Sequence, residues 1–144
     1  MNRNALAARI LKIDGVLLLV VAIIHFAATP FALRFVSSQL SPETYAQIEP
    51  PFALSFVLVG VLLPVGLTTV YCAKPIGRGQ RWARTICYFN ALGVLLLPLA
   101  LILIMPARYF RAILFVIAAI LVWIVALSMA VPLMLVQIDR SNPD

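Results

Sequence analysis

The chain has 144 residues, of which 64% are hydrophobic and only 11% are charged. A soluble domain carries about 25% charged residues, and a core of this size cannot hide so large an apolar excess. The composition excludes an ordinary soluble protein and predicts one membrane domain. The net charge of +6 does not indicate a nucleic-acid partner, because the basic residues form no stripe and stand at the ends of apolar runs.

Four stretches without Asp, Glu, Lys or Arg divide the chain, and they contain 19, 24, 23 and 27 residues. A helix needs about 20 apolar residues to cross the hydrocarbon core of a bilayer. The sequence therefore predicts an all-α, polytopic membrane protein with four transmembrane helices in an antiparallel bundle. The spans are expected over residues 12–29, 51–72, 81–105 and 109–137.

The first span is expected to end at Pro30, because the residue before a proline is driven away from helical geometry. An outer loop, 30–50, should follow it. Within this loop, Ser41-Pro42-Glu43 is typical of a helix start, with a capping hydroxyl, a proline at the first position and an acid in the first turn. We therefore expect a short helix near 42–48.

The later spans contain prolines and glycines that affect how helices pack. Each internal proline removes a backbone N–H and bends its helix. The bends either form a pocket or hinge or reflect ordinary membrane-helix packing, and the sequence leaves both readings open. Small residues allow close helix contact. The positions are Pro64, Pro98 and Pro132, together with Gly60, Gly66 and Gly93.

Basic residues predict the orientation. With the N-terminus inside, eight of them flank the cytoplasmic ends of the spans and three flank the outer ends. Such an excess marks the cytoplasmic side, so both termini are expected there, in a bacterial inner membrane. Anionic lipid headgroups are the expected partners of one cytoplasmic cluster. Its members are Lys74, Arg78, Arg81 and Arg84.

Two cysteines, Cys72 and Cys87, fall near the cytoplasmic ends of their spans. Thiols stay reduced on that side of the membrane. The sequence holds no CxxC and no Cys/His spacing, so neither a metal site nor a disulfide framework is predicted.

Ionisable groups at membrane depth are costly, so each is a candidate functional residue. His25 is the only histidine, with Thr29 one turn beyond it, and Glu49 follows in the outer loop. An imidazole can exchange a proton near neutral pH. A pair of His25 and Glu49 would bind a proton, a cation or a polar headgroup. The alternative is a structural histidine that bonds a backbone carbonyl or Glu49.

Asp14 precedes His25 by eleven residues, almost three helical turns, so both should lie on one face directed into the bundle. Asp14 is expected near the inner boundary. There it either forms a structural ion pair with Arg81 or Arg84, or it is the inner binding site of a proton or cation path whose outer binding site is His25.

Two further polar side chains lie deep in the later spans. Asn90 is expected to form a hydrogen bond to another helix, and the alternative is contact with a substrate. Trp123 stands near the middle of the fourth span. Its ring either lines a cavity or faces lipid, and a buried indole N–H needs a partner.

Some of these residues carry a resemblance. The early histidine in Ile24-His25-Phe26, followed by Thr29-Pro30, and the run Leu58-Val59-Gly60-Val61-Leu62-Leu63 with Gly66-Leu67-Thr68 resemble the DoxX-like group of small four-span bacterial membrane proteins. That resemblance implies a membrane partner of redox enzymes and carries over no catalytic residue. Asp14 also sits where small multidrug transporters have an acid, although their other signatures are missing.

No catalytic motif is present, so an enzyme is not expected and no cofactor is specified. The sequence favours a small integral inner-membrane protein that is a subunit of a membrane complex or a binder of a lipophilic ligand. One alternative is a proton-linked small-molecule transporter that acts as a homo-oligomer. Another is a membrane redox protein that shares a quinone or haem with a partner, since one histidine cannot supply two axial ligands. The expected partners are the lipid bilayer and either another protein or a second copy.

Overall fold

The computed structural model describes residues 3–104 and 113–135, except the side chains of residues 32, 36, 48, 51, 113–115, 118 and 135. Every element in these ranges is an α-helix, as predicted from the composition. Three helical stretches are long and apolar enough to cross a membrane, namely 3–39, 42–77 and 81–104, and a shorter apolar helix covers 119–134. The helices are α1 (Arg3–Gln39), α2 (Pro42–Gly60), α3 (Leu62–Gly77), α4 (Arg81–Ile104) and α5 (Ile113–Leu135).

Helix α1 contains 37 residues and continues through Pro30, so the prediction that the first span ends there is wrong. Pro30 removes only the N–H that would reach the Phe26 carbonyl. The other backbone bonds of this turn remain, so the helix continues with one bond fewer. The Thr29 hydroxyl donates to the His25 carbonyl at 2.7 Å and adds a bond in the same turn.

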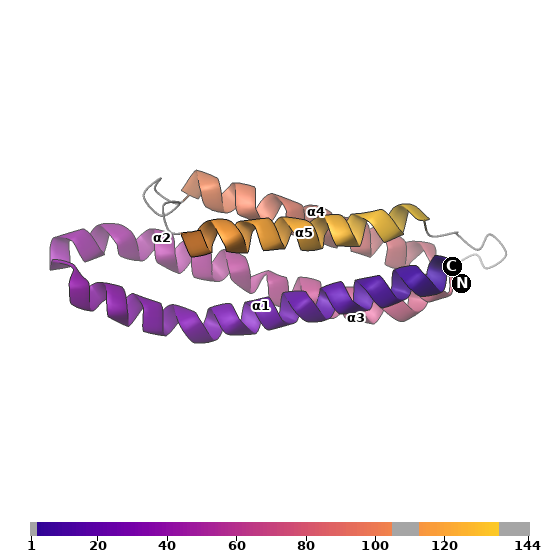
Figure 1. Ribbon diagram of the computed structural model, residues 1–144, viewed down its shortest axis with the longest axis horizontal. Helices are drawn as coiled ribbons and strands as arrows, with labels where there is room; N and C mark the ends of the chain where they lie inside the picture. The colour runs from indigo at the N-terminus through magenta and orange to yellow at the C-terminus, as the bar shows by residue number, and fades with distance from the viewer. Residues whose placement is uncertain (1–2, 105–112, 136–144) are drawn as a thin grey trace.

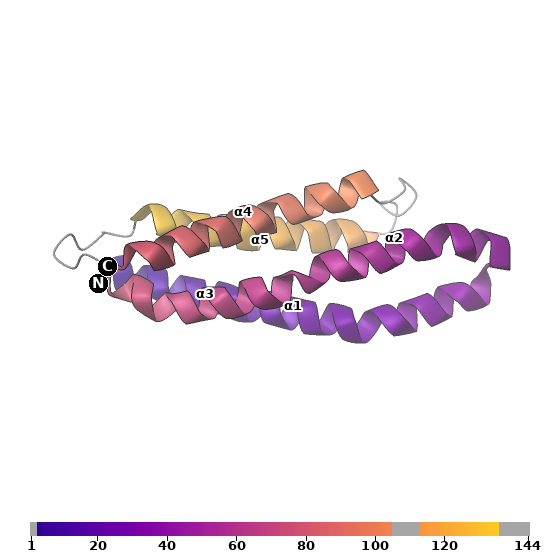
Figure 2. The ribbon, with the colours of Figure 1, turned by 180° about the vertical axis from the view of Figure 1, so that it is seen from behind.

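Helix α2 begins where the sequence predicts, because the Ser41 hydroxyl accepts from the Thr44 N–H and Pro42 occupies the first turn. The helix then continues through Pro50 and Pro51 to Gly60. The predicted outer loop over 30–50, with a helix limited to 42–48, is therefore wrong. Only residues 40 and 41 separate α1 from α2, and the hairpin they form reaches beyond α4 and α5 (Figures 1 and 2).

Helices α2 and α3 are one long helix interrupted at Val61, whose N–H bonds the Leu58 carbonyl at 3.2 Å in a tighter turn. Pro64 has no N–H for the Gly60 carbonyl, which explains the predicted bend at this place. The predicted third span agrees with α4 as far as Ile104. Residues 105–112 lie outside the described residues, as do both ends of the predicted span 109–137.

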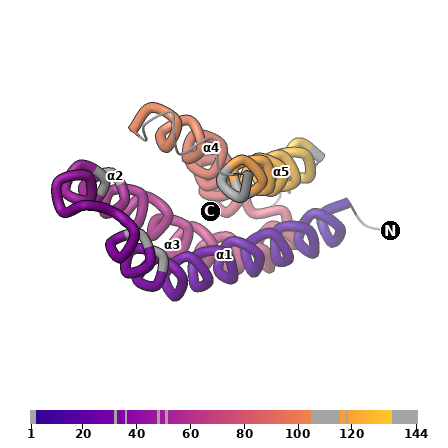
Figure 3. Tube along the Cα trace, turned by 60° about the vertical axis from the view of Figure 1, so that its left-hand side comes forward, coloured from indigo at the N-terminus to yellow at the C-terminus, as the bar shows by residue number. Residues whose placement is uncertain are grey.

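The helices form two layers. One contains α1, α2 and α3, and the other contains α4 and α5 (Figure 3). Helix α1 packs most closely on α3, where Gly15 and Gly66 face each other. A Cβ added to Gly66 would lie 2.9 Å from the Gly15 carbonyl oxygen, whereas one added to Gly93 would meet nothing within 4 Å. The predicted close contact is confirmed for Gly66 and is wrong for Gly93.

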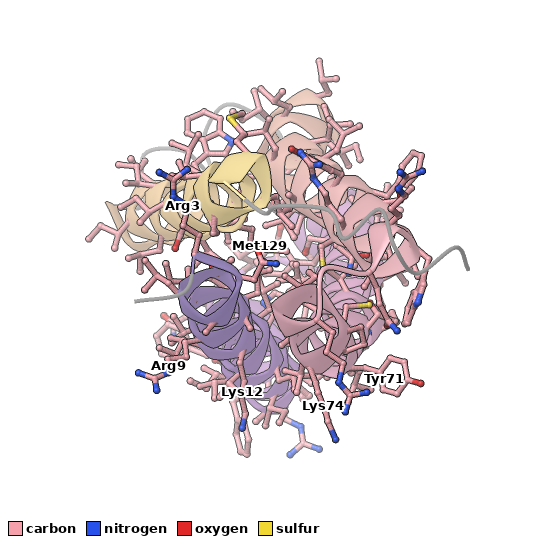
Figure 4. The ribbon with its side chains drawn as sticks, turned by 90° about the vertical axis from the view of Figure 1, so that its right-hand side faces the viewer. Arg3, Arg9, Lys12, Tyr71, Lys74 and Met129 are labelled. Carbon is pink, nitrogen blue, oxygen red and sulfur yellow. The ribbon has the colours of Figure 1, made fainter. Side chains whose placement is uncertain are left out.

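Large apolar side chains fill the space between the layers and also cover the outside. The fully buried ones include Leu18 and Met129, and Figure 4 shows Met129 between the helices. On the outer faces, Leu103 is 87% exposed and Met134 is 69% exposed. An apolar surface of this kind is stable when acyl chains cover it.

Candidate functional site

Four polar side chains, one from each of α1, α3, α4 and α5, lie at one depth between the helices, and we call them the polar layer. The set is Asp14, Thr69, Asn90 and Ser128. Asn90 donates through Nδ2 to the Thr69 hydroxyl at 2.9 Å and to that of Thr68 at 2.9 Å. A side-chain hydrogen bond joins Asp14 to Ser128. The predicted cross-helix bond of Asn90 is therefore confirmed.

The depth of these residues follows from two helix contacts. Gly15 packs against Gly66 and Val70, so the neighbouring Asp14 lies level with Thr69. The Trp123 indole N–H donates to the Leu95 carbonyl at 3.1 Å.

Helices α4 and α5 run in opposite directions (Figure 1). Five residues back from Leu95 along α4 is Asn90, and five residues forward from Trp123 along α5 is Ser128. Each step covers about 7.5 Å at 1.5 Å per residue, so Asn90 and Ser128 lie at one level.

Asp14 is the ionisable member of the polar layer and is only 4% exposed. Its Oδ2 atom has no hydrogen-bond partner, and among the described residues no ion pair reaches it. The predicted ion pair with Arg81 or Arg84 is therefore not formed. A bare carboxylate in an apolar interior is costly, so the group must be neutralised by its own proton or by a bound cation.

Pro132 leaves the carbonyl oxygen of Ser128 without its usual helical donor, as an available acceptor near Asp14. Pro132 follows Ser128 by four residues in α5 and has no N–H to donate to the Ser128 carbonyl. The Ser128 hydroxyl is already engaged with Asp14. Both oxygens of Ser128 therefore lie in the turn that contacts the carboxyl group.

An open pocket of about 350 Å³ lies between the first turns of α1 and the last turns of α5, and we call it the α1–α5 pocket. Its α1 residues lie on one side of that helix, and Asp14 is four residues beyond Ile10, the last of them. Its α5 residues lie three and four positions after Ser128. The pocket therefore lies about one turn from Asp14 and Ser128, which do not line it. Its lining is Arg3, Leu6, Ala7, Ile10, Val131 and Pro132.

His25 occupies a separate place, about 16 Å from Asp14 along α1 at 1.5 Å per residue. Its ring centroid lies 6.2 Å from that of Phe56 on α2, and its Nε2 atom is buried without a partner. Thr29 bonds the His25 carbonyl instead of the ring. Glu49 is exposed on α2 and supplies no partner to the imidazole. The structure therefore places Thr29 beside His25 and does not form the predicted pair with Glu49.

Trp123 neither stands free in a cavity nor simply faces lipid, because its N–H holds α5 to the Leu95 carbonyl. Leu95 belongs to the turn before Pro98 in α4. A proline weakens the bonding of that turn, so a carbonyl there can accept from a neighbouring helix.

The basic residues of the predicted lipid-contacting cluster gather at the end of the molecule that holds Arg3. Lys74, Arg78 and Arg81 are exposed, whereas Arg84 is half-buried and its guanidinium lies 5.4 Å from the Tyr88 ring centroid. Lys74 points outward from α3 in Figure 4. Three of the four residues are therefore free to meet headgroups, and the fourth is partly held inside.

Ser128 and Thr69 were not singled out from the sequence, because isolated hydroxyls are common in apolar helices and often bond their own backbone. Thr69 does bond the Val65 carbonyl at 2.7 Å. The usable signal was proline spacing, since Ser128 stands four residues before Pro132.

No model of a known protein family matches the chain, and no curated protein or solved structure matches it. The resemblance to the DoxX-like group therefore stays a prediction.

Proposed function

We propose that the chain is a four-span protein of a bacterial inner membrane with the basic end of its helices in the cytoplasm. The long apolar helices support a multi-pass membrane protein. The basic residues at the end that holds Arg3 support the orientation, because positive charge is retained on the cytoplasmic side. The exposed Lys74, Arg78 and Arg81 then meet anionic headgroups.

We infer that the protein is a proton-linked carrier and that Asp14 is its proton-binding group. The observation that carries this inference is the 4% exposure of Asp14 combined with an Oδ2 atom that has no partner. A buried carboxyl group with one oxygen lacking a hydrogen bond does not stabilise a helix–helix contact, so a purely structural role does not explain it. The geometry thus favours the transporter among the functions that the sequence allows.

The α1–α5 pocket indicates the class of ligand. Its lining is apolar apart from Arg3 at the basic end, and Asp14 lies one turn beyond its lining residue Ile10 on α1. When the carboxyl group gives up its proton, a cation must replace that charge inside the apolar interior. A small lipophilic cation satisfies both conditions, since its body fits the apolar wall and its charge neutralises Asp14. Exchange of one proton for one such cation keeps the site neutral in each state.

The second candidate, a binder of a lipophilic ligand without transport, rests on the same pocket of about 350 Å³. The two differ in what Asp14 does. A carrier needs the carboxyl group for each exchange, whereas an apolar binder needs only the pocket wall. A homo-oligomer stays part of the proposal, with the exposed apolar helix faces as the surfaces that a second copy would cover.

Proteoliposomes with a trapped pH-sensitive dye test the carrier, with tetraphenylphosphonium as the probe. An inward gradient of the probe is expected to drive protons out through the wild type. Asp14→Asn, which keeps the shape of the side chain, should abolish this flux, and Ser128→Ala should weaken it. Glu43→Gln, at an exposed position on α2, is the matched carboxyl-to-amide control and should leave the flux unchanged.

Two results would contradict the carrier. One is proton flux in Asp14→Asn equal to that of the wild type. The other is that the wild type and Asp14→Asn bind the probe with equal affinity and without proton exchange. That result would support a binder of a lipophilic ligand without transport. Circular dichroism of each variant checks that its helices are intact.

A further inference from the structure

The two cysteines, fifteen residues apart in the sequence, meet in the interior between α3 and α4. Cys72 is 1% exposed and Cys87 is 0% exposed, and a side-chain hydrogen bond joins them. Cys72 lies three residues beyond Thr69, and Cys87 lies three residues before Asn90. The Thr69–Asn90 hydrogen bond joins the same two helices. The two thiols therefore form the next contact between α3 and α4, one turn closer to the basic end.

A basic residue with a spare donor stands one turn from this thiol pair on α4. Arg84 precedes Cys87 by three residues on α4, and residues so spaced are neighbours on one helix face. Its guanidinium donates to the Tyr88 hydroxyl at 3.3 Å and lies 5.4 Å from the centroid of that ring. The Nε atom of Arg84 is buried and has no partner.

We propose that Cys72 and Cys87 bind one soft monovalent cation of the Cu(I) class. Thiolates prefer soft metals, and two sulfur ligands complete the linear coordination that such d¹⁰ cations accept. The described residues hold no group of three or more His, Cys, Asp and Glu side chains that could bind a metal. A closed zinc site, which needs four ligands, is therefore not available in this part of the chain.

The charges balance when Arg84 is included. Each thiol loses its proton to water at the basic end, two sulfur–metal bonds form, and the oxidation state of the metal does not change. The product carries one net negative charge, which is costly in an apolar interior unless a cation lies beside it. The unpartnered Nε–H of Arg84 supplies that charge and a hydrogen bond to a sulfur atom.

This proposal does not depend on transport at Asp14, and it is tested on the purified full chain under anaerobic, reducing conditions. Cu(I) is titrated in competition with the chromophoric chelator bicinchoninate. The wild type should bind one copper per chain and release two protons, and X-ray absorption should show two sulfur neighbours. Cys72→Ala and Cys87→Ala should each lose the bound copper. Arg84→Gln should weaken binding by about tenfold, the usual effect of removing an outer-shell partner of a metal site.

Met134→Leu is the control, because its thioether is 69% exposed on α5 and should not contribute. Copper binding that survives in the Cys72→Ala/Cys87→Ala double variant would overturn the proposal. The same holds for a wild type that binds no copper and only forms a Cys72–Cys87 disulfide with a mild oxidant. The proton count and absorption spectrum of the wild type decide the matter even if a cysteine variant does not fold.

Discussion

A single added methyl group should change the free energy of unfolding in opposite directions at Gly66 and Gly93, although both glycines lie in apolar helices. At Gly66, the new Cβ would lie 2.9 Å from the Gly15 carbonyl oxygen and 2.9 Å from Leu19 Cγ, the branch point of that side chain. Neither atom is the free end of a flexible group. Helices α1 and α3 must therefore move apart to accommodate Gly66→Ala.

The size of the change in the free energy of unfolding follows from two opposing contributions. Overpacking a well-filled contact costs about 1–3 kcal/mol, whereas alanine is favoured over glycine within a helix by up to about 1 kcal/mol. The backbone contact makes the first contribution larger, so Gly66→Ala should destabilise the protein by about 1–2 kcal/mol. For Gly93→Ala only the second applies, since no atom lies within 4 Å of the new Cβ. That variant should be more stable by about 0.5–1 kcal/mol.

The assay is unfolding in mixed micelles of a mild detergent and increasing mole fractions of dodecyl sulfate, followed by circular dichroism. The free energy of unfolding of each variant is compared with that of the wild type. If Gly66→Ala were as stable as the wild type, the close packing of α1 on α3 would be refuted. A shift of the same sign and size in both variants would refute the reasoning too, since it would reflect helix propensity alone.

The remaining predictions concern polar contacts between and within helices. Asn90→Leu should lower the free energy of unfolding by about 0.6–1.7 kcal/mol, the range for interhelical hydrogen bonds in membranes, and an unchanged value in the micelle assay would exclude the bonds of Asn90 to α3. Trp123→Phe should cost about 0.5–1.5 kcal/mol, because the Leu95 carbonyl loses a donor, and a matching loss in Trp82→Phe would show that the effect is not specific to position 123. Ser41→Ala removes the cap of α2 at about 1 kcal/mol, so amide hydrogen exchange should become faster around Thr44 while unfolding of the other helices stays the same.

The sequence predicted the helical class and the approximate spans because uncharged stretches of membrane length are a direct signal. It failed at Pro30, where the first span was expected to end, and over 30–50, where a loop with only a short helix was expected. A proline removes one backbone bond and leaves the other helical bonds intact, so α1 continues through Pro30, α2 continues through Pro50 and Pro51, and the expected loop is a helical hairpin.

The candidate site was predicted only in part. Asp14 and Asn90 were identified because ionisable and amide groups at membrane depth are rare. Their partners were not, since no periodicity relates residues on different helices. The bond from Asp14 to Ser128 depends on how α1 crosses α5. The Cys72–Cys87 pair was missed for the same reason, as fifteen residues of sequence match no known ligand spacing.

The central claim is that Asp14 lies inside the helices, meets no cationic partner among the described residues and holds a proton. Infrared spectroscopy of the protein in lipid bilayers tests this directly, because a protonated carboxyl group in an apolar place absorbs apart from an ionised one. A band of the protonated form should be present in the wild type, disappear in Asp14→Asn and shift in Ser128→Ala, where the hydrogen bond is lost. If wild type and Asp14→Asn gave the same spectrum in this region, the carboxyl group would be ionised and paired, and the carrier built on it would have to be abandoned.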